Sequence, residues 1–282
     1  MTQQEQDKYY QSYSTEYSKA ERFAFSAFRD VINSQLKEVI SAVLLRGIIA
    51  TELDLTNLIL EKPIAETFSA VFVRVGRQFR DFQKAQFDKQ KNASGLVAGF
   101  FSEAFDRQMQ DYALTVAGAH ITSITETTRR QVKEVLAEAA KNRLSVRDAA
   151  KLIRKRLGGQ FSKNRALLIA RTETTSAANH GQYITAKNAG IDLEKLWLVR
   201  IDGRQRDWHA DMKGKKVGLT EEFTVGGAKM LYPGDPKGGA SNLCNCRCTC
   251  AYIPKESVPV SQSTSPSIGL IGQAIAELLR DG

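Results

Sequence analysis

Long apolar runs and the motifs of the commonest nucleotide-binding and metal-dependent enzymes are missing from this sequence. There is no P-loop, no G-x-G-x-x-G segment after a strand, no H-E-x-x-H and no paired C-x-x-C among the 282 residues, which disfavours nucleotide-binding and metalloprotease functions. The most apolar stretch, residues 42–50, is short and interrupted by Arg46, so it is not expected to span a membrane. The polar N-terminus does not resemble a signal peptide. We expect a protein without a membrane anchor that stays in a cytoplasm or inside something assembled there.

Proline is scarce and acidic residues are outnumbered. With 6 prolines, 42% hydrophobic and 25% charged residues, the chain is typical of a globular protein of one large or two modest domains. The 40 Lys and Arg residues against 31 Asp and Glu give a net charge of +9, which favours contact with nucleic acid or an acidic protein surface. The excess is dispersed, with short concentrations at residues 151–156, 200–206 and 213–216. Each of these is also typical of a solvated face.

The pattern from about residue 15 to residue 190 is helical. Apolar residues recur at spacings of three and four over residues 64–89 and 101–139, and the second stretch predicts one long helix or two that meet near Gly118. Ser145 and Asp148 form a short capping signature for a helix that ends at Gly158. A further helix is predicted from Ser162 to about residue 190. Residues 1–142 are thus predicted to be a helical region, and 145–190 the helices of a second domain spanning 143–254.

The period changes near residue 191. Residues 196–201 read as a strand, and short strand-like pieces follow around Val217, Phe223 and Met230. Residues 243–253 alternate as a strand would, so 191–254 are predicted to form a small α/β, β-rich module. The Ser- and Pro-rich stretch after it, with a short amphipathic helix at its end, makes 255–282 a linker and a C-terminal helix. The predicted fold class is α+β, a long mainly helical N-terminal region followed by the small module.

All four cysteines lie within Cys244–Cys250. On a straight strand, side chains of one face are about 6.6 Å apart, which is too far for four thiolates to enclose one Zn²⁺ with Zn–S bonds of about 2.3 Å. At most two adjacent cysteines could bind one ion, and only where the backbone bends. A zinc site from Asp202, His209, Cys246 and Cys248 is one hypothesis; the other is that alternate cysteines pack in the core as small hydrophobes. A disulfide is the least favoured.

Glu173 presents a second candidate. On an ideal helix it shares a face with apolar residues such as Ile169, and an ionised carboxylate there needs a partner. Arg204, Arg206 or Arg247 would supply one and would tie the helix to the module. The functional alternative is a catalytic carboxylate, for which no His or nucleophile has convincing spacing.

The order of these residues resembles the MuF-like head morphogenesis proteins, minor head proteins of tailed bacteriophages. The resemblance covers about residues 130–254. It rests on the following residues: Ala170-Arg171-Thr172-Glu173, Asn179, Gly181, Trp197, Asp202, Arg204, Arg206, His209, Asp211, Gly214, Val217, Phe223, Tyr232-Pro233-Gly234-Asp235 and Asn245-Cys246-Arg247-Cys248. It implies structural or interface roles for Arg171, Glu173, Asn179, Trp197 and the three arginines. It also implies that the histidine and the two cysteines sit together; Cys244 and Cys250 flank the family's pair.

The resemblance implies a minor capsid protein encoded beside the portal and present in few copies inside the head. Its partners would be the portal protein, other head proteins and the packaged double-stranded DNA, with the host cytoplasm as its location during assembly. An enzyme is the alternative, because MuF-like domains also occur joined to toxins and Arg171-Thr172-Glu173 loosely resembles ADP-ribosyltransferases. No toxin domain is expected after Pro254. A DNA-binding module, suggested by the charge, is the third hypothesis.

Overall fold

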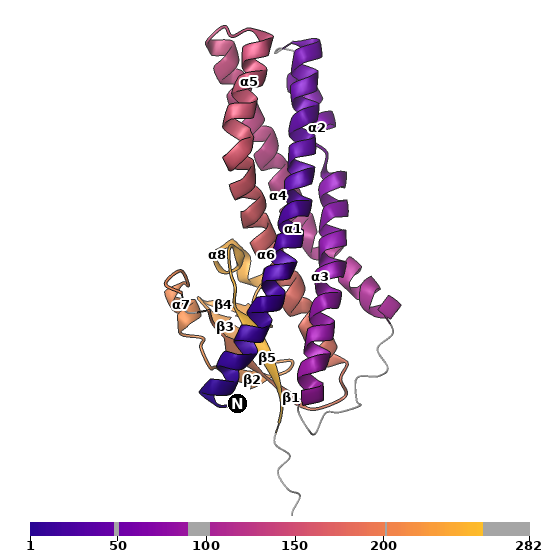
Figure 1. Cartoon of the computed structure of the whole chain (residues 1–282), viewed down its shortest axis with the longest axis vertical. Coiled ribbons are helices and arrows are strands. Elements are labelled where there is room, and N and C mark those ends of the chain that lie inside the picture. The colour runs from indigo at the N-terminus through magenta and orange to yellow at the C-terminus, as the bar shows by residue number, and fades with distance from the viewer. Residues whose placement is uncertain (48–50, 90–101, 201, 256–282) are drawn as a thin grey trace, which may run out of the picture.

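The computed structural model describes residues 1–47, 51–89, 102–200 and 202–255. The helical part contains the elements α1 (Gln3–Arg46), α2 (Thr51–Leu58), α3 (Glu61–Lys89), α4 (Ser102–Lys141), α5 (Val146–Leu157) and α6 (Gly159–Lys187). Figure 1 shows these helices along the long axis of the molecule, with the strands gathered at one end. Both the long helical region and the small β-rich part predicted for an α+β protein are present. No helix in the described ranges is long and apolar enough to cross a membrane.

Helix α1 begins twelve residues before the helical pattern predicted from the sequence. Thr2 caps it, because its hydroxyl accepts a hydrogen bond from the Glu5 backbone N–H and the Glu5 carboxylate accepts one from the Thr2 N–H. The polar start is helical because three tyrosines spaced by four residues, Tyr9, Tyr13 and Tyr17, form a buried stripe within it. The expected start near residue 15 was therefore wrong.

The remaining helices follow the sequence pattern closely. Residues 102–141 form one helix, α4, rather than two that meet at Gly118. Ser145 caps α5 and accepts a hydrogen bond from the Asp148 N–H, as predicted. Helix α6 begins at Gly159, three residues before the predicted Ser162, and ends at Lys187.

The module contains two small antiparallel sheets. Its elements are β1 (Leu193–Leu198), α7 (Asp207–Ala210), β2 (Lys216–Gly218), β3 (Phe223–Val225), β4 (Ala228–Met230), the 3-10 turn η1 (Pro236–Gly238), α8 (Gly239–Leu243) and β5 (Thr249–Pro254). Strand β1 lies between β2 and β5, and β3 pairs with β4. The predicted strand 196–201 thus lies a few residues too far along the chain.

The prediction of one alternating strand over 243–253 was wrong. Helix α8 ends at Leu243, residues 244–248 form a loop, and only Thr249–Pro254 is a strand. Asn245 has a φ of +57°, a left-handed conformation that asparagine tolerates and a strand excludes. The cysteines therefore lie on a bent backbone.

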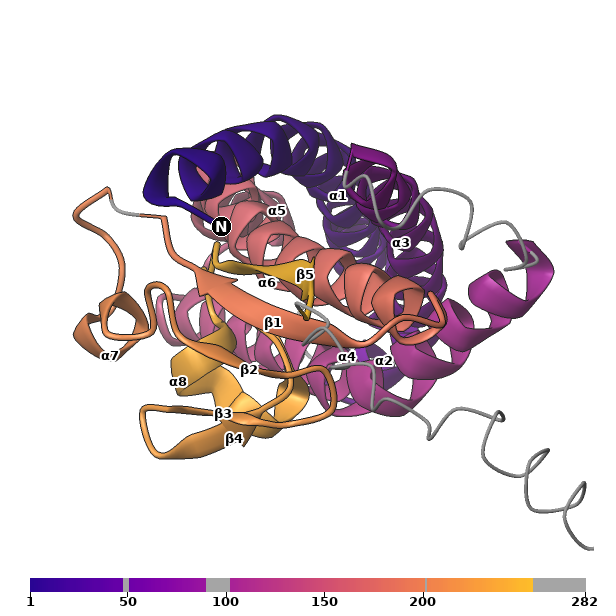
Figure 2. The same ribbon diagram turned by 90° about the horizontal axis from the view of Figure 1, so that it is seen from below.

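The module packs against helix α6 and the first turns of α1. Figure 2 shows β5 and β1 running beside α6, with the N-terminus of α1 close to β5. The buried apolar residues form one continuous core from Tyr9 to Tyr252, so the helices and the module share it. The predicted linker and C-terminal helix beyond Lys255 lie outside the described residues.

Candidate metal centre

His209, Cys246 and Cys248 come together in the module. His209 lies on the single turn of α7, and the two cysteines lie on the loop between α8 and β5. The Nδ1 atom of His209 is 3.7 Å from the Sγ of Cys246 and 3.6 Å from the Sγ of Cys248, and all three ligand atoms lie within 4.8 Å of one another. All three side chains are buried. They are the set of three His, Cys, Asp or Glu side chains in the described ranges that is close enough to share one ion.

These separations fit a zinc ion. With Zn–S bonds of about 2.3 Å and Zn–N bonds of about 2.0–2.1 Å, a tetrahedral ion holds its nitrogen and sulfur ligands roughly 3.5 Å apart. The two N–S distances are within a few tenths of an ångström of that value. Two thiolates and one imidazole are also the ligand types that zinc prefers.

Asn242 sets the tautomer of His209. The Asn242 Nδ2 group donates to the carbonyls of Gly238, at 2.9 Å, and Val225, at 3.3 Å, so its Oδ1 is turned the other way. That oxygen lies 3.1 Å from the His209 Nε2. An amide oxygen only accepts hydrogen bonds, so Nε2 is the donor in this contact. In the tautomer that binds a metal, the Nδ1 lone pair would then face the two sulfurs. An outer hydrogen bond of this kind is usual for metal-binding histidines.

Polar side chains of α6 form hydrogen bonds with the cysteine loop, residues 244–248. The Thr175 hydroxyl donates to the Cys246 carbonyl, and Asn179 Nδ2 donates to the Cys248 carbonyl at 3.1 Å. In the other direction, the Asn245 N–H donates to the Thr172 hydroxyl at 3.3 Å. A bent loop cannot pair its backbone N–H and C=O groups with those of a neighbouring strand. These hydrogen bonds give the buried groups partners instead.

Tyrosines of α1 complete this support. The Tyr10 hydroxyl donates to the Arg247 carbonyl at 2.9 Å, and the Tyr9 hydroxyl to the Cys250 carbonyl at 3.2 Å. Neither these tyrosines nor Asn242 was singled out from the sequence. The four-residue spacing of the tyrosines marks a buried face of a helix, and Asn242 lies on a short helix. Which carbonyl groups these side chains reach depends on the packing of segments that are distant in the sequence.

The two thiols share their electrostatic environment. A hydrogen bond with the Cys248 thiol lowers the pKa of Cys246, and His209 adds to this lowering against the effect of burial. The same hydrogen bond, together with burial, raises the pKa of Cys248. One thiolate is therefore favoured in the pair, and a thiolate is the form that binds a metal.

The two flanking cysteines lie apart from this pair. Cys250 is fully buried on β5, where burial raises the pKa of its thiol to about 12, so it packs as a small hydrophobe. Cys244 is half-buried at the end of α8. Cys250 thus fits the core-packing hypothesis, whereas Cys246 and Cys248 are the candidates for metal binding.

Asp202, the fourth predicted ligand, lies outside the cluster. Its carboxylate pairs with Arg247 Nη1 at 2.8 Å and Arg200 Nε at 3.0 Å, and it accepts from the Arg204 N–H at 3.2 Å. Arg206 donates to the Cys244 carbonyl at 2.7 Å. These arginines brace the loops around the cluster.

The partner predicted for Glu173 was wrong. Its buried carboxylate lies 3.1 Å from His120 Nδ1 of α4, and none of the three predicted arginines contacts it. The hydrogen bond with Glu173 raises the pKa of His120. Arg171 pairs with Glu21 of α1 at 2.5 Å. Both residues therefore join helices to one another, because the side of α6 that carries them faces α4 and α1 rather than the arginines of the module.

Trp197 forms one wall of the cluster. Its fully buried ring meets His209 edge to face, with centroids 6.2 Å apart, and contacts Phe223 in the same way at 5.1 Å. This apolar wall excludes water from one side of the thiols and the imidazole, which strengthens electrostatic interactions among them.

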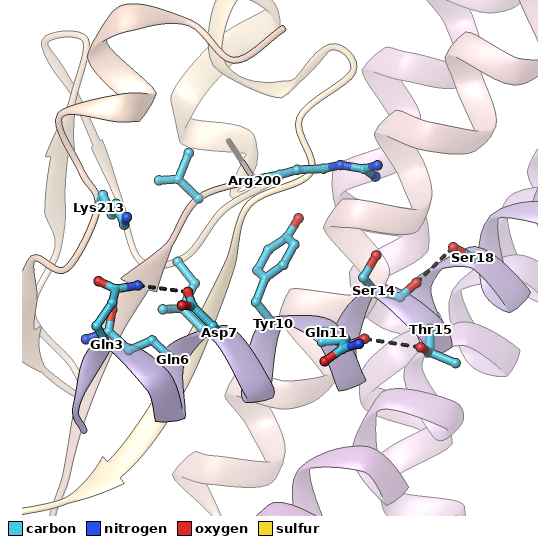
Figure 3. A pocket seen from close by; sticks show the side chains of 12 residues that line it. Gln3, Gln6, Asp7, Tyr10, Gln11, Ser14, Thr15, Ser18, Arg200 and Lys213 are labelled. Carbon is cyan, nitrogen blue, oxygen red and sulfur yellow. Dashed lines mark hydrogen bonds between the residues drawn. The ribbon is translucent and has the colours of Figure 1, made fainter. Parts of the chain in front are cut away.

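Two cavities lie near the cluster. A small one of about 20 Å³ is lined by His209, Cys246 and Cys248 and by the residues Arg200, Arg204, Gln205, Arg206, Asn245 and Arg247. A larger groove of about 550 Å³ runs between α1 and the end of β1. Figure 3 shows its polar wall of α1 side chains with Arg200 opposite. Arg200 lines both.

Comparison with known proteins identifies relatives of this chain. The model of the family described as "Phage Mu protein F like protein" matches residues 90–251, which is more than half of the chain and includes His209, Cys246 and Cys248. No solved structure matches the chain significantly.

Three curated proteins are similar over part of their length. NAD(+)–arginine ADP-ribosyltransferase EFV of Enterococcus faecalis is 43% identical over 93 residues, 32% of this chain and 19% of that protein. Minor head protein GP7 of Bacillus phage SPP1 is 31% identical over 117 residues, 39% of this chain and 36% of GP7. Uncharacterized protein YqbB of Bacillus subtilis is 29% identical over 131 residues, 45% of this chain and 42% of YqbB. The chain spans less than half the length of each.

Proposed function

The chain belongs to the family of Phage Mu protein F like proteins, and on this premise we propose that it is a minor head protein of a tailed bacteriophage. It would act inside the head near the portal, in assembly, DNA packaging or DNA delivery. The observation that carries this proposal is that the family match spans α6 through the start of β5, which contain the cysteine loop, His209 and the polar side chains of α6 that bind the loop. The likeness to a protein named as a minor head protein supports it.

Mass spectrometry of purified phage particles tests the proposed location. The protein should be present in few copies per particle, should resist added protease while the head is closed, and should become accessible once the head is opened. Copurification with the portal protein from infected cells tests the proposed partner. Absence from washed particles, or cleavage by protease while heads are intact, would reject a place inside the head.

Within this function, we propose that His209, Cys246 and Cys248 hold one Zn²⁺ that staples α7 to the loop before β5. The site supports this through its N–S distances, the lone pair that Asn242 directs and the burial of all three ligands. Zinc would add a cross-link between α7 and the cysteine loop, two segments that lie outside both sheets.

The position of Glu173 does not support an enzymatic role. A catalytic carboxylate has to reach its substrate, whereas that of Glu173 is buried and engaged by His120. The match to the ADP-ribosyltransferase covers 19% of that protein. Incubation with labelled NAD tests this: the protein should not modify itself, and transfer that Glu173→Gln abolishes would overturn the non-enzymatic proposal.

DNA contact is a second candidate function, favoured by the surface of α5. Its exposed cationic residues are Arg147, Lys151, Arg154, Lys155 and Arg156. Two of them pair with carboxylates, Lys151 with Asp148 and Arg156 with Glu138. The others form a cationic face near one end of the bundle (Figure 1).

Retention on double-stranded DNA at rising salt tests this role. Replacing Arg147 and Lys155 with glutamine should weaken DNA binding. The slope of log K against log salt concentration should also become shallower, by the amount that corresponds to roughly one to two phosphate contacts. A matched pair of lysines on the module, Lys213 and Lys216, serves as the control. Absence of binding at low salt, or equal loss with the control, would reject the α5 surface as a DNA site.

A further inference from the structure

The candidate metal centre supplies three ligands where zinc takes four. In the part of the chain that the structure describes, the cluster consists of His209, Cys246 and Cys248 alone. Structural zinc sites are closed by four protein ligands, whereas sites with three keep a position for an external ligand. A centre built from this cluster therefore has one position to fill.

A small cavity borders the cluster. Its volume is about 20 Å³, and all three cluster residues line it. A space of that size takes roughly one water-sized group, so a single donor atom fits while an imidazole ring does not.

The rest of the cavity lining is strongly cationic. Four arginines line it, Arg200, Arg204, Arg206 and Arg247, and we call them the arginine rim. Asp202 is the carboxylate that offsets this charge, and it is already engaged by Arg200 and Arg247. The planar guanidinium group matches a carboxylate in two-point hydrogen bonding, and an oxygen anion is a good zinc ligand.

From this arrangement we infer that the fourth position takes the carboxylate oxygen of a ligand from outside the described residues, guided and held by the arginine rim. This inference rests on the proposed zinc centre. The test distinguishes two sources of the carboxylate: a separate molecule, or the acidic residues Glu256, Glu277 and Asp281 of this chain. The positive charge of the zinc ion and of the arginine rim favours a carboxylate from either source over a neutral or basic ligand.

Cobalt replacement tests the inference on the full chain. Zinc is exchanged for Co²⁺, whose visible absorption reports the ligands around it, and sodium acetate is the probe. Where a separate molecule is the natural ligand, acetate should change the spectrum of the unaltered chain saturably, and acetamide, its neutral counterpart, should not. Arg204→Gln should weaken acetate binding by about 5-fold, the loss of one partly exposed ion pair. Lys213→Gln, in the neighbouring groove, is the matched control.

A second variant identifies a ligand from the chain itself. The triple variant Glu256→Gln, Glu277→Gln, Asp281→Asn should respond to acetate whatever the source. A response in this variant but not in the unaltered chain supports the inference and assigns the carboxylate to residues 256–282.

Three results would overturn the inference. If the chain takes up no cobalt with thiolate character, both the metal centre and its open position fail. If cobalt binds but neither the unaltered chain nor the triple variant responds to acetate, the open position alone fails. If Asp202→Asn is needed before acetate acts, Asp202 itself fills the position and no external carboxylate binds.

Discussion

Gly181 of α6 lies directly on Gly76 of α3. A Cβ atom at residue 181 would be 2.9 Å from the carbonyl oxygen of Gly76 and 3.0 Å from its Cα. Gly76 is covered on its other side by Met109 of α4, whose side chain a Cβ at residue 76 would meet at 2.5 Å. Three helices thus converge where only glycine fits, and this contact sets how closely α6 packs on α3.

Gly181→Ala is expected to destabilise the protein. Alanine favours a helix over glycine by up to about 1 kcal/mol, but the new methyl group meets backbone atoms that cannot move aside, and overpacking costs about 1–3 kcal/mol. Urea unfolding should show a net loss. Gly118→Ala is the control on α4, where nothing lies within 4 Å, and it should be neutral or stabilising. A stabilising Gly181→Ala would contradict the close helix contact.

Cys246→Ser should abolish zinc binding while Cys244→Ser leaves it intact. Cys246 points its sulfur at His209, whereas Cys244 lies outside the cluster. Elemental analysis of the purified protein should find about one zinc per chain in the unaltered protein and in Cys244→Ser. Equal zinc content in both variants would place the metal elsewhere, and folded protein without zinc would leave the cysteines as core residues.

Asn242→Leu should lower the zinc affinity by about 10- to 100-fold, the usual effect of losing a partner of a metal-binding histidine. Asn242→Asp keeps an oxygen that accepts from His209 Nε2, and it should bind zinc more tightly than the leucine variant. Competition with a chromogenic chelator measures both. If the two variants lower the melting temperature equally without changing the zinc affinity, Asn242 has only a packing role.

The His120–Glu173 contact should stabilise the protein more in acid than in base. Because Glu173 raises the pKa of His120 in the folded state, folding binds a proton there. This contribution is complete below the unfolded pKa of about 6.5 and is lost as the pH rises through the higher folded value. The free energy of unfolding lost in His120→Gln should therefore be larger at about pH 5.5 than at about pH 8.5. A loss independent of pH would show that the charged form does not matter.

Tyr17→Phe should cost about 1 kcal/mol of unfolding free energy. Its hydroxyl donates to the Arg171 carbonyl at 3.0 Å and lies 3.1 Å from the Thr175 hydroxyl, so its removal loses a buried hydrogen bond, while Thr175 keeps its bond to the Cys246 carbonyl. Tyr252→Phe is the matched control, since its buried hydroxyl has no partner among the described residues and should cost nothing. Chemical denaturation compares the two. If the two variants lose the same unfolding free energy, the hydrogen bonds of the Tyr17 hydroxyl add no net stability beyond the packing of the ring.

Much of the helical architecture was predictable because helix signals are local. The 3.6-residue period over 64–89 and the Ser145 cap each depend on residues a few positions apart. The start of α1 was missed because its buried stripe consists of tyrosines spaced by four in an otherwise polar segment. The bend at Asn245 was missed because alternation of cysteines looks the same on a strand and on a loop.

The amino-acid sequence by itself determined the α+β class, the family and the helices whose period and caps are local. Only the tertiary structure decided which side chains meet. Glu173 contacts His120 rather than an arginine, Asp202 pairs with arginines and lies away from the two sulfurs, and Asn242 accepts a hydrogen bond from His209. These pairings depend on the packing and rotation of helices and loops far apart in the chain, and no local period encodes those.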